Sequence, residues 1–168
     1  MLEEINSRFN SELKKLTREN VNNTIFNLGN PSETLLSAGI ENKPIKLYGN
    51  KLPLKSEKHE YSPSDLKDLP RAIAAPIAIF NDKQHGGHTI LTEIIIAGDN
   101  ALVALGVGKH NDREYNTIKT IFPKNAQKIR EWFNSNITLY SNKEKVREYL
   151  LRHPSLIREP QAITDFTW

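Results

Sequence analysis

The sequence predicts an α+β fold in which a central antiparallel β-sheet of about four strands is packed by helices from both ends of the chain. Apolar residues recur at helical spacing near the N-terminus, the period changes to that of strands between residues 77 and 122, and helical spacing returns after residue 125. Helices therefore precede and follow the sheet, whereas a parallel sheet would require strands and helices to alternate. We expect one domain over residues 1–152 and a C-terminal tail over residues 153–168.

Three elements are predicted in the first fifty residues. An amphipathic helix within residues 1–20 places an apolar side chain at every third or fourth position, at Leu2, Ile5, Phe9, Leu13 and Leu16. A short second helix begins with Asn30 as its N-cap and Pro31 at its first position, and Gly39 ends it. Residues 45–48 alternate in polarity as a short strand does.

The middle of the chain supplies one more helix and then the sheet. The run Ser62-Pro63-Ser64-Asp65 is typical of a helix N-terminus, and Pro70 and Pro76 interrupt the segment that follows. Turn-forming residues at Gly86-Gly87 and at Gly98-Asp99-Asn100 separate three β-rich runs, which predicts an antiparallel meander. With a fourth run, the predicted strands cover residues 77–80, 89–97, 102–107 and 115–122.

Two helices and an extended segment are predicted after the sheet. Asn125 caps a helix that continues to Phe133, residues 137–140 are extended, and Ser141 begins the last helix. The proline-containing tail from His153 onward is expected to be a loop or a segment that depends on a partner.

The composition excludes several classes of protein. The 168 residues include no cysteine, which removes disulfide frameworks, cysteine nucleophiles and thiolate metal sites. A hydrophobic share of 38% argues against a disordered chain. The apolar runs are too short to cross a bilayer, and no export signal follows Met1. We therefore expect a protein that acts in the cytoplasm, either of the cell that makes it or of a target cell into which it is delivered.

Positive charge is concentrated toward the C-terminus. The net charge is +3, and residues 101–168 hold eleven Lys and Arg against seven Asp and Glu. This distribution is compatible with a polyanion as partner. An ordinary solvated surface explains the same numbers, and on charge alone it is the better interpretation.

The familiar catalytic and metal-binding motifs are missing. No His-Glu-x-x-His or Gly-x-Ser-x-Gly sequence occurs, and Gly106-Val107-Gly108-Lys109 lacks the spacing of a phosphate-binding loop. His85 and His88 lie three apart, but on a glycine-rich turn, where a solvated loop is the simpler interpretation than a metal site. We expect neither a metal nor a cofactor.

The densest reactive group is Lys55-Ser56-Glu57-Lys58-His59, just before the predicted helix start at Ser62. Neighbouring lysines favour the neutral form of His59, which could then act as a base, and Lys55 could hold a phosphate. An exposed charged loop remains the alternative, and spacing alone favours it.

A series of short motifs runs in order along nearly the whole chain. They are Leu28-Gly29-x-Pro31-Ser32, Ala38-Gly39-Ile40, Pro44-Ile45, Lys58-His59, Leu69-Pro70, Pro76 to Phe80, Leu91-Thr92-Glu93, Asn116-x-Ile118-x-Thr120-Ile121-x-x-Lys124, Trp132 and Tyr140. Over residues 5–150 this order resembles the C-terminal domain of MuF-type phage polypeptides and the related phage nucleases of the barnase–EndoU–colicin–RelE group. The resemblance implies a nuclease-like α+β domain from a toxin or effector system whose target is RNA.

The resemblance also implies a catalytic set. The family's Lys-His pair matches Lys58 and His59, and its strand glutamate matches Glu93. In its Asn-to-Lys segment, Thr120 stands where serine is usual and keeps a hydroxyl. Phe122 stands where tyrosine is usual, so any role of that tyrosine hydroxyl is lost.

RNA cleavage of this type uses the ribose 2′-OH as nucleophile, a base, an acid and cations that stabilise the phosphorane. The implied acid–base pair is His59 with Glu93, and Lys58 and Lys124 would neutralise the phosphate while Thr120 donates a hydrogen bond. The implied substrate-binding residues are Lys55, Asn116, Lys119 and Tyr140, with Tyr140 able to stack on an unpaired base.

Structural roles remain open for the same residues. Glu93 could face solvent on an edge strand, Lys124 could be a surface charge, Thr120 could be a strand former, and Asn116 could hydrogen-bond a turn.

The leading hypothesis is a metal-independent endoribonuclease toxin or effector of phage or mobile-element origin. RNA, with tRNA among the candidates, would be its substrate, and an immunity or antitoxin protein is a second candidate partner. The alternative is a non-catalytic protein-binding module of the same fold, such as an inhibitor, an immunity-like protein or a virion accessory. ADP-ribosyl transfer ranks last, because the Arg…Ser-Thr-Ser…Glu-x-Glu series is missing.

Overall fold

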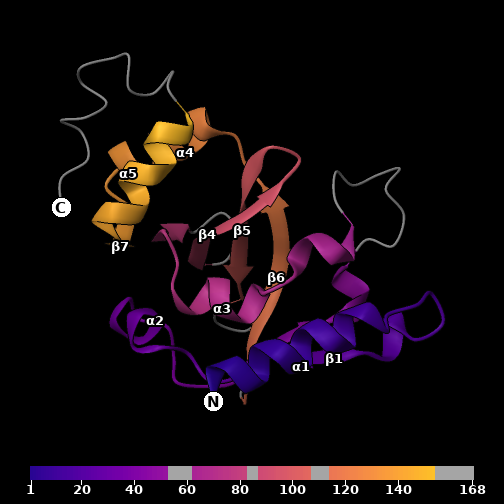
Figure 1. The fold of residues 1–168 in the computed structure, drawn as a ribbon. Coiled ribbons are helices and arrows are strands. Elements are labelled where there is room, and N and C mark those ends of the chain that lie inside the picture. Colours follow the sequence, from indigo (N-terminus) through magenta and orange to yellow (C-terminus); the bar gives the residue numbers. More distant parts are fainter. Residues whose placement is uncertain (53–61, 83–86, 107–113, 154–168) are drawn as a thin grey trace.

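A seven-stranded β-sheet forms the centre of the computed structural model, which describes residues 1–52, 62–82, 87–106 and 114–153 (Figure 1). Its strands are β1 (Ile25–Asn27), β2 (Ile45–Tyr48), β3 (Ala78–Asp82), β4 (Gly87–Ile96), β5 (Asp99–Leu105), β6 (Asn116–Pro123) and β7 (Thr138–Ser141). The α-helices are α1 (Leu2–Lys14), α2 (Glu33–Ser37), α3 (Leu69–Ala74), α4 (Ala126–Asn134) and α5 (Lys143–Arg152). Short 3₁₀ helices are η1 (Val21–Asn23), η2 (Gly49–Lys51) and η3 (Pro63–Leu66).

The strands follow the order β1-β2-β6-β5-β4-β3-β7 across the sheet. Strands β3 to β6 are the predicted antiparallel meander, and β7 adds to it antiparallel to β3. On the other side β2 pairs with β6 in parallel, and β1 pairs with β2. The α+β prediction is confirmed. The predicted number of about four strands was too low, because the short strands β1, β2 and β7 extend the meander at its two edges.

A two-residue turn joins β4 to β5. Ala97 and Gly98 have φ values of 52° and 87°, and Ile96 pairs with Asp99 directly across the turn. Positive φ at both central residues fits a type I′ turn, whose twist matches that of the two strands. Asn100, predicted within the turn, therefore lies in β5.

Two apolar cores cover the two faces of the sheet, and Figure 1 shows α1 and the α4–α5 pair on opposite sides of it. The face that bears Ile79 and Val103, here the α1 face, packs against α1, α2 and α3. The face that bears Phe80 and Leu102, here the α5 face, packs against α4 and α5. No residue of β1 or β2 belongs to this second core, so α4 and α5 cover the sheet from β3 only as far as β6.

Side-chain caps mark the starts of three of the five α-helices, α2, α4 and α5. Asn125 caps α4 as predicted, and a helix begins at Ser62 as predicted, with a capping box between Ser62 and Asp65, although it is a 3₁₀ helix. The cap of α2 is Ser32 and not Asn30, and the cap of α5 is Asn142, one residue after the predicted start. In each corrected case a second suitable cap lay one or two residues away in the sequence.

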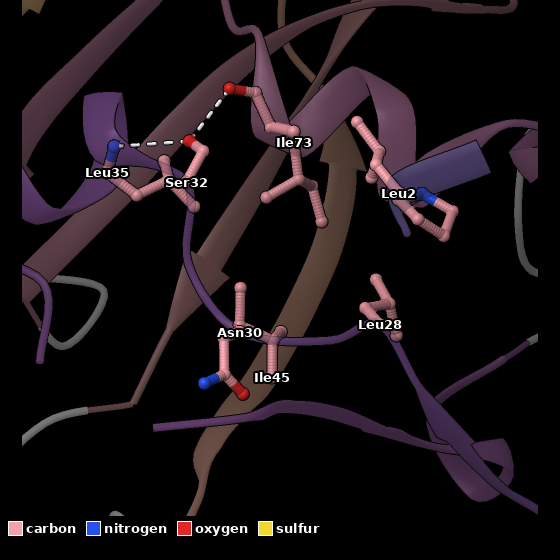
Figure 2. A pocket seen from close by; sticks show the side chains of 9 residues that line it. Leu2, Leu28, Asn30, Ser32, Leu35, Ile45 and Ile73 are labelled. Carbon is pink, nitrogen blue, oxygen red and sulfur yellow. Dashed lines mark hydrogen bonds between the residues drawn. The ribbon is translucent and has the colours of Figure 1, made fainter. Parts of the chain in front are cut away.

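A small pocket lies where α1, α2, α3 and β2 meet (Figure 2). Its walls are apolar apart from Asn30 and Ser32, and its volume of about 20 Å³ holds about one water molecule. The Ser32 hydroxyl already donates to the Ala74 carbonyl at 2.8 Å. The pocket is a packing defect and too small for a substrate.

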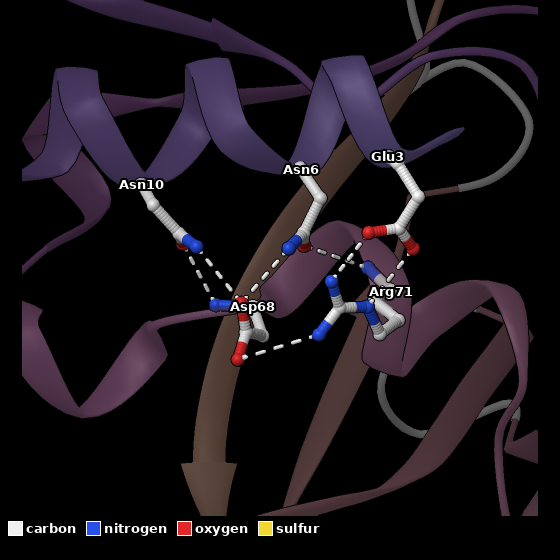
Figure 3. Close-up of polar contacts among 5 residues, drawn as sticks. All are labelled: Glu3, Asn6, Asn10, Asp68 and Arg71. Atoms are coloured by element: carbon white, nitrogen blue, oxygen red, sulfur yellow. Dashed lines mark hydrogen bonds and ion pairs between the residues drawn. The ribbon is translucent and has the colours of Figure 1, made fainter. Parts of the chain in front are cut away.

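Polar side chains fasten α1 to the start of α3 (Figure 3). The amides of Asn6 and Asn10 both donate to Asp68 Oδ1 at 2.8 Å, and Asn10 Oδ1 accepts from the Asp68 amide at 2.8 Å. Arg71 donates its backbone N–H to Asn6 and two side-chain N–H groups to Glu3. The donors on Asn10 and then Asn6 lower the pKa of Asp68, which holds the uncommon φ of 68°. This cluster, the Asp68 latch, links the first helix to the rest of the fold.

Candidate nucleic-acid interface

Six of the nine predicted site residues lie in the described part of the chain. Lys55, Lys58 and His59 fall within residues 53–61, which lie outside it. The meeting of the His59 imidazole with the other predicted groups therefore stays a prediction.

Asn116 is built into the framework of the sheet. Its side chain is 4% exposed, and its Nδ2 donates to the carbonyls of Glu41 and Lys43 at 2.8 and 2.9 Å. Its backbone N–H donates to Pro44 at 2.9 Å. Both amide hydrogens are used to hold the segment before β2 against β6, so the structure gives Asn116 a positioning role there.

Glu93 lies on β4 and forms an ion pair with α5. Its carboxylate is 2.7 Å from Lys145 Nζ, with the two side chains 48% and 24% exposed. Lys145 Nζ also donates to the Ala75 carbonyl at 2.5 Å, at the C-terminal end of α3. The ion pair and this hydrogen bond together link β4, α5 and the end of α3.

Tyr140 and Thr120 lie on opposite faces of the sheet. Tyr140 pairs with Ile79 and packs against the core on the α1 face. Thr120 pairs with Ala104, whose neighbour Val103 is on the α1 face, so Thr120 points to the α5 face. One bound nucleotide therefore cannot contact Tyr140 and Thr120 from the same side of the sheet.

A β-bulge in β6 sets which of its side chains share a face. Ile118 pairs with Leu105 and Thr120 pairs with Ala104, which leaves Lys119 as the extra residue. Lys119 is exposed at this bulge. Beyond it, Thr120 and Lys124 project from the α5 face.

Two threonines lie in one row across the α5 face. Thr89 of β4 pairs with Ala104 of β5, which pairs with Thr120 of β6, so the three side chains share that face. Thr89 is fully buried, and its hydroxyl has no hydrogen-bond partner in the described part of the chain. We call these three residues the hydroxyl row. An unpaired buried hydroxyl is uncommon and requires an explanation.

Two lysines supported by aromatic rings flank the hydroxyl row along β6. Lys124 Nζ is 4.8 Å from the centre of the Trp132 ring, which itself packs edge-on against Phe80. Lys46 Nζ is 4.8 Å from the centre of the Tyr115 ring. Such cation–π contacts hold each ammonium group in place without neutralising it.

The two lysines lie near opposite ends of β6 on the α5 face, with Thr120 between them. Lys46 lies beside Thr117 at the start of β6, and Lys124 follows its end, which separates them by about 20 Å at the usual rise per residue. No carboxylate in the described part of the chain lies within ion-pair distance of Lys124. We call Lys46, Tyr115, Thr120, Lys124 and Trp132 the polar strip. Its cations, hydroxyl and rings are the groups that contact phosphates and bases.

The perturbed pKa values in the described residues lie away from the polar strip. In α5, burial raises the pKa of Tyr149, and burial lowers the pKa of the neighbouring His153. Besides Asp68, the Asp68 latch contains Glu3, whose pKa the Arg71 guanidinium lowers through hydrogen bonding. None of these groups touches the hydroxyl row.

Lys46, Thr89 and Trp132 were not among the predicted site residues. A sequence shows which residues lie on a strand, but only the pairing register shows that Thr89 lies opposite Ala104 and Thr120. Lys46 gave no signal, because β2 precedes β6 by about seventy residues and joins it in parallel.

The described residues offer neither a metal centre nor a membrane-spanning helix. No group of three or more His, Asp or Glu side chains there is placed to hold a metal ion. None of the helices in that part of the chain is both long enough and apolar enough to traverse a bilayer.

Comparison with known proteins gives one relationship. Residues 51–148 match the family model of the phage MuF C-terminal domain, and this range covers more than half of the chain. No curated protein and no solved structure matches it. The matched range contains the meander, β7, α3, α4 and most of α5, whereas α1, α2, β1 and β2 precede it. By this match, the chain belongs to the phage MuF C-terminal domain family.

Proposed function

We propose that this domain is a metal-independent endoribonuclease effector of phage or mobile-element origin that binds RNA along the polar strip. The observation that carries the proposal is the pair of ring-supported lysines, Lys46 and Lys124, on either side of the hydroxyl row. A strip of about 20 Å accommodates a short single-stranded segment, the form in which RNA bases are available to aromatic rings.

The proposed reaction is attack of a ribose 2′-oxygen on the adjacent phosphorus. The P–O5′ bond breaks, a base accepts the 2′-hydroxyl proton, and an acid supplies a proton to the departing 5′-oxygen, which leaves a 2′,3′-cyclic phosphate. In the proposal, His59 is the acid–base group, Lys58 and Lys124 neutralise the phosphate, and Thr120 donates a hydrogen bond to it. Relationship to the barnase–EndoU–colicin–RelE nucleases is part of this proposal.

Cleavage is tested by incubating the purified protein with total RNA and with tRNA in EDTA. We expect cleavage by the wild type, none by His59→Ala, and wild-type cleavage by His85→Ala as a matched histidine control. Equal activity of the wild type and His59→Ala would contradict the role of His59 as the acid–base group. An inactive wild type would contradict the proposed nuclease activity.

Binding is tested separately with a 2′-O-methyl oligonucleotide, which lacks the nucleophile and cannot be cleaved. Lys124→Gln and Lys46→Gln should each weaken binding and lower the slope of the salt dependence by about 0.7 for each phosphate that the variant no longer neutralises. Lys128→Gln is the charge-matched control. Lys128 lies on α4, the helix that covers the α5 face, but its Nζ is 3.6 Å from a Glu131 carboxylate oxygen in an ion pair. If all three variants weaken oligonucleotide binding equally, then binding depends only on the total charge of the protein and not on the polar strip.

The second candidate is a non-catalytic binding module of the same fold. Glu93 is held by Lys145, and Asn116 is used to fasten the sheet, so two of the predicted site residues already have structural partners. This candidate predicts a folded wild type with no RNA cleavage and a stoichiometric protein partner. Under this candidate, Glu93→Gln lowers the stability of the protein, and RNA is cleaved by neither the wild type nor the variant. In a nuclease that uses Glu93, the same substitution abolishes RNA cleavage.

A further inference from the structure

We propose that the sheet extension formed by β1 and β2 is a base-stacking platform for a single-stranded segment of RNA. This β1–β2 platform consists of Ile25 and Asn27 of β1 and of Lys46 and Tyr48 of β2. The inference rests on the proposed function, because it starts from Lys46, one end of the polar strip, and extends the contact surface toward the edge of the sheet. It adds Ile25, Asn27 and Tyr48, which precede the residues that match the family model.

The platform residues point away from the core that buries the rest of β1 and β2. Phe26 and Leu47, both fully buried, belong to the core on the α1 face. Side chains alternate between the two faces of a strand, so the platform residues on either side of Phe26 and Leu47 project from the α5 face. The core on that face contains no residue of β1 or β2, and Figure 1 shows the α4–α5 pair well away from β1.

The platform is open to solvent. Ile25 is 52% exposed, and Asn27, Lys46 and Tyr48 are partly exposed. The Tyr48 ring makes no contact with another ring or with a cation in the described part of the chain. An aromatic ligand that stacks on Tyr48 therefore has no ring or cation to displace from it.

The pairing register arranges the platform as one apolar row and one polar row. Ile25 lies directly opposite Tyr48, and Asn27 lies directly opposite Lys46. The two rows are two residues apart along the strands, which is about 6.6 Å and comparable with the separation between a base and the phosphate of its own nucleotide. A base that stacks on Tyr48 and contacts Ile25 would therefore bring its phosphate to Lys46 and Asn27.

The polar row has donors available for that phosphate. Lys46 Nζ is held over the Tyr115 ring at 4.8 Å and forms no ion pair in the described part of the chain. Asn27 Oδ1 accepts from the Gly29 amide at 3.0 Å, which fixes the side-chain amide and leaves its Nδ2 without a partner among the described residues. A cation and an amide donor beside an apolar row fit a ligand that carries both a phosphate and a base.

Such a surface selects unpaired RNA. In a duplex each base is stacked between its neighbours, so its face cannot reach a tyrosine ring, whereas the bases of a single strand can be splayed out and stacked on aromatic side chains. The platform is also continuous with the polar strip, because Lys46 lies beside Thr117 at the start of β6. One strand of RNA could therefore follow β6 and place its end on β2 and β1.

The test uses two matched pairs of variants. Tyr48→Leu removes the ring, and Tyr48→Phe keeps it. Ile25→Thr removes apolar surface from the platform, and Ile95→Thr makes the same change at an isoleucine that is 43% exposed on β4, which β6 and β5 separate from β2. Fluorescence anisotropy measures binding of the 2′-O-methyl oligonucleotide and of an abasic oligonucleotide of the same length at several salt concentrations. The melting temperature shows whether each variant is folded.

We expect Tyr48→Leu to weaken binding of the 2′-O-methyl oligonucleotide about tenfold, the loss expected for one stacked base. Ile25→Thr should weaken it by less, and Tyr48→Phe and Ile95→Thr should leave it unchanged. The slope of the salt dependence should be the same in Tyr48→Leu as in the wild type, because stacking releases no counterions, whereas Lys46→Gln should lower it. Binding of the abasic oligonucleotide should be the same in Tyr48→Leu and the wild type.

Unchanged binding by Tyr48→Leu, in a wild type that binds the oligonucleotide, would overturn the platform and leave the polar strip standing. An equal loss of affinity for the oligonucleotides with and without bases would also overturn it. If Tyr48→Leu does not fold, equal binding by Ile25→Thr and Ile95→Thr is the overturning result. A wild type that binds no oligonucleotide would overturn both proposals, and loss of a co-purifying protein from Tyr48→Leu would then assign this surface to a protein partner.

Discussion

The Asp68 latch makes a sharp prediction about acid and stability through the substitution Asn6→Asp. Asn6 is 2% exposed, and its Nδ2 lies 2.8 Å from Asp68 Oδ1. The substitution changes this donor into a second carboxylate oxygen with almost no change in shape. The Asn6 Oδ1 that accepts from the Arg71 amide at 3.2 Å keeps an equivalent in the variant.

The expected loss of stability at pH 7 is about 4 kcal/mol. A hydrogen bond to a charged group contributes about 1.5–3 kcal/mol, and that contribution disappears. Two carboxylates about 4 Å apart repel by about 4 kcal/mol at an effective dielectric constant of 20. The Asp68 side chain is 37% exposed, so we discount this repulsion to about half for solvent screening.

The sign of the pH dependence should reverse in the variant. In the wild type, hydrogen bonds from Asn10 and Asn6 lower the pKa of Asp68, so its contribution is complete above the ordinary aspartate pKa and is lost as the pH falls through the lowered value. In Asn6→Asp, the two carboxylates raise the pKa of one of them. Its folded form then binds a proton more readily, so stability should rise as the pH falls from about 7 to about 5.

Urea unfolding followed by far-UV circular dichroism at pH 7 and pH 5 measures both effects. Asn22→Asp is the control, because Asn22 is exposed and the substitution adds the same charge. We expect that control to change stability by less than about 0.5 kcal/mol. A loss in Asn6→Asp that equals the control, or that is the same at both pH values, would refute the proposed electrostatics of the latch.

Three further substitutions test close packing and buried polar groups, and the melting temperature of each variant is the measurement. Gly49→Ala should lower stability by more than about 2 kcal/mol, because its Cβ would collide with the Val21 carbonyl oxygen. A smaller loss than in Gly98→Ala, where only the positive φ opposes alanine, would contradict this. Asn116→Ala should cost about 2 kcal/mol, because it removes two hydrogen bonds, and a neutral result would show that this contact is dispensable. Tyr149→Phe should be neutral or stabilising, because the buried hydroxyl has no partner in the described residues, and a clear loss would reveal one.

Much of the fold could be predicted from the sequence because its signals are local. Apolar alternation and turn residues located the four strands of the meander, and Asn125 was identified as a cap from its place before a helical run. Strand β1 was missed, because three residues, Ile25–Asn27, give no alternating run. Ser32 displaced Asn30 as the cap of α2 through a contact that joins it to Ala74, forty-two residues away, which no local pattern contains.

The candidate site could be predicted only in part, because its geometry depends on pairing register. In a regular strand Asn116 and Thr120 would share a face, but the extra residue Lys119 places them on opposite faces. The register between β3 and β7 also shifts, between Ile79 and Phe80. Tyr140 pairs with Ile79 next to this shift and lies on the α1 face. The sequence therefore placed four candidate site residues on or next to β6 without showing which of them share a face.

The parallel pairing of β2 with β6 has a consequence for how the chain reaches its final form. Ile45 and Asn116 meet although about seventy residues separate them, whereas the meander is built from neighbouring hairpins. Contacts between distant residues form slowly, since a long loop must close before they stabilise anything. We expect the hairpins to assemble first and Lys46 to arrive with β2 as a late event, so a newly made molecule would acquire one end of the proposed RNA-binding surface only when folding is almost complete.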